Sequence, residues 1–278
     1  CHGPGRVQHG EPTMATAGER DVKANGISIH CRIDGTEGAP WITFSNSLAT
    51  DLHMWDAQAE AFGRDYQLLR YDFRGHGGTD VTSPPYDLAL LAADLIGLWD
   101  ALGIEQGHYV GLSIGGAMGL ELVTSYPERV LSAAICDARC RSTQYHLEGW
   151  AGRIEAVLAG GMEAMVEEFT GGWFTPAADP ADVDKIAAMI RATDLEGFRG
   201  GVAAVAGVNH EARLGDIQCP ALFLAGTEDV GDFPKQAVDM HEAVPGSALV
   251  LLERAAHLCN MERSDAFNEA LRDFLASQ

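Results

Sequence analysis

A serine flanked by glycines is the residue best placed for covalent chemistry. Residues 111–115 read Gly-Leu-Ser-Ile-Gly, after an apolar run at 108–111 and before a helix-like segment at 114–125. A serine on a sharp turn from strand to helix has a strained backbone, and its neighbours must be small because a Cβ there would collide with adjacent segments. The pattern therefore predicts Ser113 as a nucleophile at the N-terminus of a helix, whose free N–H groups favour negative charge.

A serine hydroxyl is a weak nucleophile, so it needs a histidine base that is oriented by a carboxylate. For a serine in this context the acid and then the histidine are expected later in the chain. His257 fits because it follows the last predicted strand, and Asp229 fits because it directly follows the strand before that. Glu228 is a competitor for the role of the acid, and so is Asp137 at the end of an earlier strand. Asp229 is the preferred acid.

The negative oxygen that forms during attack needs two N–H donors. One is expected from the residue after the nucleophile, which is Ile114. The other should come from the loop after the third strand, where residues 45–48 read Ser-Asn-Ser-Leu, and the backbone N–H of Leu48 is the candidate.

The elements that must position these residues alternate between short apolar strands and helices, which is typical of an α/β fold with a mostly parallel sheet covered on both faces. The segments 21–24 and 27–33 flank Asn-Gly and predict an opening hairpin. We expect about eight strands flanked by helices. Residues 138–213 lack a comparable strand and predict an inserted helical cap.

The expected organisation of the chain therefore has three parts. Residues 21–137 and 214–278 form the core domain, and residues 138–213 form the cap. Residues 1–20 are rich in Gly, Pro and His towards their start and are expected to be a leader outside the fold, either disordered or added artificially.

Composition limits the partners. The chain of 278 residues has 40 acidic and 19 basic side chains and a formal charge of -21, which repels nucleic acids and anionic membrane surfaces. An anionic substrate would need a local cation near the site. The six cysteines form neither a CxxC pair nor a zinc-like pattern, so reduced thiols, a cytoplasmic location and no metal are expected. The expected partner is a small molecule, and the oligomeric state stays open.

The nucleophile turn belongs to a wider pattern that resembles 3-oxoadipate enol-lactonases of the α/β-hydrolase fold superfamily. The resemblance runs from about residue 20 to the end. It is carried by the segments 45–56, 72–77, 111–116, 150–154, 172–175 and 256–262. It implies that Ser113, Asp229 and His257 open an enol-lactone in aromatic catabolism without a cofactor.

The resemblance also extends into the cap, where Trp150, Arg153 and Trp173 are candidates for binding the substrate. The substrate of this family carries a carboxylate, and Arg153 could pair with it. The alternative is a solvated arginine on a cap helix, because long cationic side chains are mostly exposed.

Other activities use the same machinery. A different lactonase, such as one acting on acyl-homoserine lactones, or a carboxylesterase would need the same three residues with a different cap. A non-catalytic binding protein with this fold is a further alternative, although an intact serine, acid and histidine argues against it.

Overall fold

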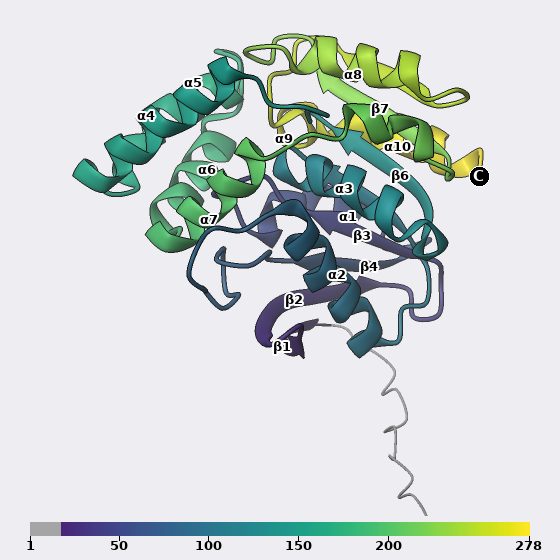
Figure 1. The fold of residues 1–278 in the computed structure, drawn as a ribbon. Coiled ribbons are helices and arrows are strands. Elements are labelled where there is room, and N and C mark those ends of the chain that lie inside the picture. The colour runs from purple at the N-terminus through teal and green to yellow at the C-terminus, as the bar shows by residue number, and fades with distance from the viewer. Residues whose placement is uncertain (1–17) are drawn as a thin grey trace, which may run out of the picture.

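The computed structural model describes residues 18–278, and within them the strands form one sheet of eight (Figure 1). The strands are β1 (Gly18–Ala24), β2 (Ile27–Gly35), β3 (Trp41–Ser45), β4 (Gln67–Tyr71), β5 (Gly107–Leu112), β6 (Val130–Cys136), β7 (Ala221–Gly226) and β8 (Ala248–Leu252). Their order across the sheet is β1-β2-β4-β3-β5-β6-β7-β8. Among these eight strands, β2 pairs antiparallel with β1 and β4, and the other neighbouring pairs are parallel. The predicted mostly parallel α/β sheet is confirmed.

Helices cover both faces of this sheet. The α-helices are α1 (Asp56–Phe62), α2 (Leu88–Leu102), α3 (Ile114–Ser125), α4 (Gln144–Gly160), α5 (Glu163–Trp173), α6 (Pro180–Ala192), α7 (Leu195–Ala206), α8 (Phe233–Ala243), α9 (Cys259–Glu262) and α10 (Ser264–Ala276). Three 3-10 helices in the described residues are η1 (Leu52–Trp55), η2 (Pro127–Arg129) and η3 (Glu211–Asp216). Within residues 18–278, none of the helices combines the length and the apolar character that crossing a membrane requires.

Strand β3 shows how the sheet is buried on both sides. Successive side chains of a strand point to opposite faces. Accordingly, Thr43 accepts a hydrogen bond from Trp99 of α2 (Nε1–Oγ1, 3.0 Å), while the ring of Phe44 lies 5.1 Å from that of Trp55. Trp55 in turn packs against Phe267 of α10 at 6.1 Å. The central strands therefore read as continuous apolar runs, because both of their faces lie in the core.

The opening hairpin has the predicted turn but a longer first strand. Asn25 and Gly26 both have positive φ, 44° and 80°, as the two-residue turn between Ala24 and Ile27 requires. Of the predicted leader, residues 1–17 lie outside the described residues. Residues 18–20 belong to β1, so the prediction that they lie outside the fold was wrong. The start of β1 gave no apolar signal because its polar side chains lie at the sheet edge, where Glu19 accepts a hydrogen bond from Arg32 at 2.9 Å.

Helices α4 to α7 follow β6 and precede β7, and they lie together at one end of the sheet (Figure 1). The two ends of this insertion meet. Ser142 N donates to Val208 O at 2.8 Å, His210 N donates to Cys140 O at 2.6 Å, and Arg141 forms a single antiparallel bridge with Asn209. The insertion is thus closed at its base, and the division into core and cap at residues 138 and 213 stays a prediction.

Candidate active site

Ser113 lies between β5 and α3 in a backbone conformation that is unusual for its residue type. Its φ and ψ are 60° and −116°, in a region that costs a non-glycine residue about 1–3 kcal/mol. A Cβ at Gly111 would come within 2.4 Å of the Gly115 carbonyl oxygen, and one at Gly115 within 2.4 Å of the Ser45 carbonyl oxygen. Both glycines are therefore required by close packing, and the turn presents the half-buried Ser113 side chain to a cavity.

His257 and Asp229 approach the same cavity from two neighbouring strand ends. Asp229 follows β7, His257 follows β8, and Nδ1 of His257 lies 2.7 Å from Oδ2 of Asp229. Both side chains are buried, whereas the alternative acid Glu228 is exposed. Because Nδ1 is engaged by the carboxylate, Nε2 is the imidazole nitrogen left to exchange a proton in the cavity.

Burial lowers the pKa of His257 to about 4, and the positive charge of Arg139 acts in the same direction. The imidazole is therefore neutral near pH 7, the form that can accept a proton from a serine hydroxyl.

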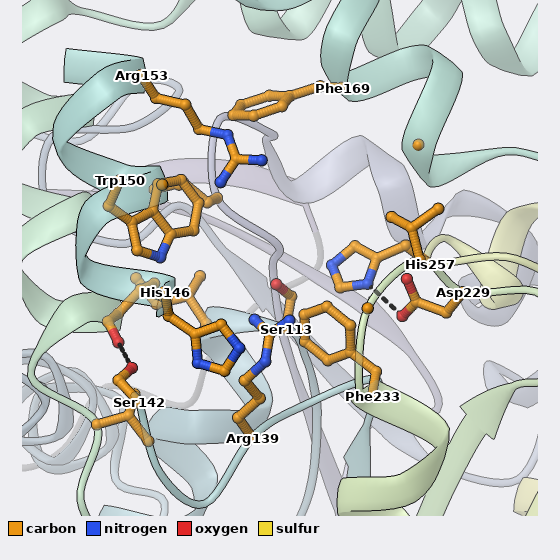
Figure 2. A pocket seen from close by; sticks show the side chains of 18 of the residues that line it. Ser113, Arg139, Ser142, His146, Trp150, Arg153, Phe169, Asp229, Phe233 and His257 are labelled. Atoms are coloured by element: carbon orange, nitrogen blue, oxygen red, sulfur yellow. Dashed lines mark hydrogen bonds and ion pairs between the residues drawn. The ribbon is translucent and has the colours of Figure 1, made fainter. Parts of the chain in front are cut away.

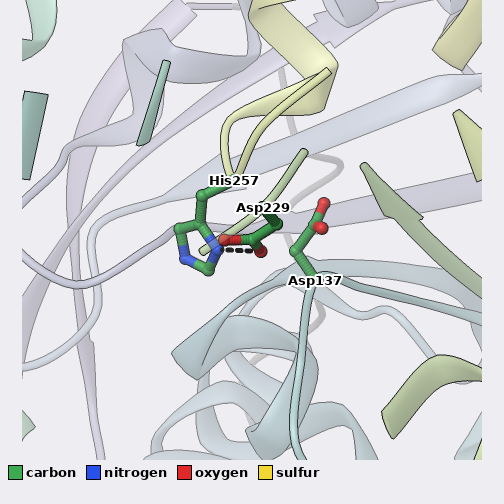
Figure 3. Close-up of side chains that lie close together, drawn as sticks. All are labelled: Asp137, Asp229 and His257. Carbon is green, nitrogen blue, oxygen red and sulfur yellow. Dashed lines mark hydrogen bonds and ion pairs between the residues drawn. The ribbon is translucent and has the colours of Figure 1, made fainter. Parts of the chain in front are cut away.

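Asp137, the other alternative acid, lies behind the pair rather than in the cavity. In Figure 3 Asp229 lies between His257 and Asp137. The Asp137 side chain is fully buried and accepts hydrogen bonds from Gly226 N (2.9 Å) and Cys259 Sγ (2.9 Å). Burial, and then the nearby charge of Asp229, raise its pKa well above the ordinary value.

Two carboxyl groups this close do not both ionise readily. Oδ1 of Asp229 is buried and, within residues 18–278, has no hydrogen-bond partner unless Asp137 carries a proton. Burial raises the pKa of Asp229 as well, but a hydrogen bond from Asp137 and the charge of Arg139 act in the opposite direction. We therefore assign the proton to Asp137 and the negative charge to Asp229.

The same three side chains are the group of described residues that could in principle hold a metal ion, with one ligand atom of each within 4.8 Å of the others. Their buried hydrogen bonds already account for the arrangement, since His257 Nδ1 bonds Asp229 and both oxygens of Asp137 accept hydrogen bonds. The hydrogen bonds thus hold His257 and Asp229 as a pair, with the Asp137 side chain behind them.

Ser113 and His257 line one cavity, although the structure has no hydrogen bond between them. Catalytic hydrogen bonds are often long without substrate and shorten in the complex. The missing hydrogen bond is therefore compatible with His257 acting as the base for Ser113.

The predicted oxyanion donors also border the cavity. Leu48 and Ile114 both line it, and for their backbone N–H groups the structure has no hydrogen-bond acceptor within the described residues. Two hydrogen bonds of Asn46 hold the loop that carries Leu48 in place. Asn46 O accepts from Gly115 N at 3.2 Å, and Asn46 Nδ2 donates to Tyr71 O at 2.9 Å. Two N–H groups are therefore available next to Ser113.

The cavity has a volume of about 380 Å³ and lies between the sheet and the inserted helices (Figure 2). All three cap residues predicted to bind substrate line it: Trp150 and Arg153 on α4 and Trp173 on α5. Arg153 is not free, because Glu168 of α5 accepts from its Nε at 2.7 Å. Its guanidinium also lies 4.7 Å from the ring centre of Trp150.

Among the lining residues that were not predicted are Arg139, His146 and Phe233. Arg139 could have been found, because it follows the end of β6 and parallel strands gather functional side chains at their carboxyl ends. Phe233 packs on His257, the predicted base, with a distance of 4.6 Å between the ring centres. Its position on α8 gave no signal, because an aromatic residue at the start of a helix usually belongs to the core.

Glu262 ties the inserted helices to the loop of the base. One of its oxygens accepts from the Thr175 backbone N–H at 3.1 Å and from the Thr175 hydroxyl, and the other accepts from Ala256 N at 2.9 Å. Next to it, Leu258 N donates to Trp173 O at 3.0 Å. The position of His257 is therefore coupled to the end of α5.

The chain is similar to a known protein family and to individual known proteins. The family model described as alpha/beta hydrolase fold matches residues 40–264. The chain is 30% identical to 3-oxoadipate enol-lactonase 2 of Acinetobacter baylyi, with 90% of this chain and 94% of that protein covered. It is 28% identical to a protein named putative carbamate hydrolase RutD from Pseudomonas savastanoi, covering 86% and 95% of the two chains.

A solved structure gives the same result. The crystal structure of the enol-lactonase from Burkholderia xenovorans LB400 superposes with a TM-score of 0.89 at 34% identity, covering 92% of this chain and 100% of that one. The similarity therefore includes the inserted helices as well as the sheet.

Proposed function

Because the chain belongs to the alpha/beta-hydrolase fold family as an enol-lactonase-like member, we propose that it opens a small lactone through Ser113, Asp229 and His257, with 3-oxoadipate enol-lactone as the substrate. It is a hydrolase of the carboxylic-ester and lactone type. The observation that carries the proposal is the buried His257–Asp229 contact of 2.7 Å beside the cavity that holds Ser113.

In the first half of the reaction, Ser113 Oγ attacks the lactone carbonyl carbon while His257 Nε2 takes the hydroxyl proton. The oxygen of the tetrahedral intermediate becomes negative and accepts from the N–H groups of Leu48 and Ile114. When the ring C–O bond breaks, His257 returns the proton to the leaving oxygen. The product is an acyl-enzyme in which the leaving group stays attached to the acyl chain.

In the second half, water displaces Ser113 Oγ from the acyl carbon. His257 Nε2 takes a proton from water, the resulting hydroxide attacks the ester carbonyl, and the proton passes to Ser113 Oγ as the acyl-enzyme breaks. The ring-opened enol acid leaves and becomes its keto form. Asp229 stabilises the imidazolium that appears in each half, without becoming protonated itself.

Hydrolysis rates on three substrates test the proposal: 3-oxoadipate enol-lactone, an acyl-homoserine lactone and a short p-nitrophenyl ester, each with wild type and Ser113→Ala. We expect the enol-lactone to be hydrolysed fastest and only with Ser113 present. Faster Ser113-dependent turnover of either other substrate would replace the named substrate and keep the mechanism. If none of the three substrates is hydrolysed in a Ser113-dependent way, the proposal is wrong.

A further inference from the structure

Two arginines are among the described residues that line the cavity, in a chain whose formal charge is -21. Such a chain repels anions at long range, so a bound anion needs a cation inside the cavity. The partners of Arg153 and Arg139 show which of the two can serve.

Arg153 has two of its three guanidinium nitrogens on a carboxylate. Its Nε and Nη2 both lie 2.7 Å from the same oxygen of Glu168, and its guanidinium stacks on Trp150. A substrate carboxylate at this position would have to compete with Glu168 for the same donors. Arg153 therefore has a structural role in the wall of the cavity, where it links α4 to α5.

Arg139 is held differently. Its Nε donates to Asp232 Oδ1 at 2.6 Å, and its guanidinium carbon lies 3.7 Å from the ring centre of Phe233. Within residues 18–278 neither Nη1 nor Nη2 donates a hydrogen bond. The side chain is fixed at one edge by an acid and at one face by an aromatic ring, and its two outer nitrogens are available to a ligand. This geometry matches the two oxygens of a carboxylate.

The available nitrogens lie close to the reacting groups. The ring of Phe233 contacts the guanidinium of Arg139 on one side and the imidazole of His257 on another, at 3.7 Å and 4.6 Å. The positive charge of Arg139 also contributes to lowering the pKa of His257, and it offsets part of the rise that burial causes in the pKa of Asp229. Figure 2 shows the Arg139 side chain running between those of His146 and Phe233 towards Ser113.

We propose that Nη1 and Nη2 of Arg139 form an anion subsite that binds a carboxylate on the substrate. The site then selects lactones or esters that carry a carboxylate a few bonds from the carbonyl attacked by Ser113. This inference rests on the proposed function, because it assigns part of the same substrate to a residue outside the triad.

The test compares a γ-lactone bearing a CH2COO− substituent with the same lactone bearing CH2CONH2, which differs in charge and hardly in shape. The measured quantity is the ratio of kcat/KM for the acid to kcat/KM for the amide. Losing a hydrogen-bonded charge pair should lower this ratio about 10- to 100-fold in Arg139→Gln, mainly through KM for the acid. Arg139→Lys keeps the charge without the two-pronged geometry and should restore part of the ratio.

Two further variants serve as controls. Arg191→Gln removes an exposed arginine that pairs with Glu163 outside the cavity lining, and it should leave the ratio unchanged. Arg153→Gln should change the ratio less than Arg139→Gln. If Arg153→Gln removes the preference for the acid, or if Arg139→Gln changes the acid and the amide equally, the subsite assignment is wrong.

A binding measurement separates this inference from the proposed reaction. Ser113→Ala should bind glutarate, and Ser113→Ala with Arg139→Gln should bind it about 10- to 100-fold more weakly, as measured by calorimetry. If neither lactone is hydrolysed but this difference in binding is found, the reaction is wrong and the anion subsite stands. Equal binding by the two variants would overturn the subsite even if the lactones are hydrolysed.

Discussion

Nδ1 of His257 lies 2.7 Å from Oδ2 of Asp229, and this contact determines which nitrogen of the imidazole faces the cavity. A neutral imidazole that donates from Nδ1 has its lone pair on Nε2, where a serine hydroxyl can give up a proton. Because the two residues follow adjacent strands, the sheet itself sets their separation.

Replacing Ser113 by alanine should lower kcat by about 10⁴-fold or more, because the covalent step is lost. The fold should be retained, since alanine removes only a half-buried hydroxyl. Steady-state kinetics with the lactone, together with circular dichroism, check both expectations. The exposed Ser125 at the end of α3 offers a matched control, and Ser125→Ala should keep wild-type rates. Comparable losses in the two variants would mean that Ser113 is not the nucleophile.

Asp229→Asn should lower kcat by about 10³- to 10⁴-fold, because an amide can donate to Nδ1 and then favours the wrong imidazole tautomer. KM should change little, since the carboxylate acts through His257. The neighbouring, exposed Glu228 provides the control, and Glu228→Gln should behave like wild type. A larger effect of Glu228→Gln than of Asp229→Asn would reverse the assignment of the acid.

Asp137→Asn should keep kcat within about 10-fold of wild type, because the amide imitates a neutral carboxylic acid and can still donate to Asp229. Asn also tolerates the positive φ of 41° at this position. Asp137→Ala should be less stable by about 1–3 kcal/mol, since it leaves buried polar groups without partners. Kinetics and urea denaturation test the pair of variants. If Asp137→Asn is as slow as Asp229→Asn, then Asp137 is ionised in the enzyme.

The pH profile of kcat/KM should show an acid limb near the His257 pKa of about 4, because only the neutral imidazole can act as a base. The positive charge of Arg139 contributes to lowering that pKa, so Arg139→Gln should raise it and move the limb to higher pH. The amide-bearing lactone is the substrate to use, since it does not titrate in this range. A limb that moves to lower pH in Arg139→Gln would contradict the proximity of the two charges.

Glu262→Ala should lower the free energy of unfolding by about 2–4 kcal/mol and reduce kcat, since three donors lose a charged acceptor and the loop of His257 loses its link to α5. Urea denaturation and kinetics measure the two effects. Glu269→Ala, at an exposed position on α10, is the control and should change neither quantity. A variant that loses stability but keeps kcat would show that the link does not position His257.

The sheet and the triad candidates could be predicted because parallel strands bring their carboxyl ends to one edge. Ser113, Asp229 and His257 each follow a strand, so chain order alone suggested their meeting. The charge state of the cavity could not be predicted in the same way. Glu168 pairs with Arg153 from a different helix, and Asp232 and Phe233 fix Arg139 from a loop and a helix more than ninety positions later in the chain. Such pairings depend on how helices pack, which no local pattern encodes.

The start of β1 and the role of Asp137 could not be predicted from the sequence for other reasons. An edge strand needs no apolar face at its outer end, so Glu19 and Arg20 gave no strand pattern. Asp137 looked like an alternative acid because it follows β6, and only its burial behind Asp229 shows that it faces away from the cavity.

The backbone pairing of Cys140 and Ser142 with His210 and Val208 brings the two ends of the inserted segment together. Chain enters and leaves the insertion at one point, so the distance that any replacement must bridge is short and already set by the sheet. Loop-closure entropy rises only slowly with length, which means that insertions of quite different size could be grafted onto the same neck. We expect that exchanging this one contiguous stretch of the gene changes the substrate, while the order of Ser113, Asp229 and His257 along the chain stays the same.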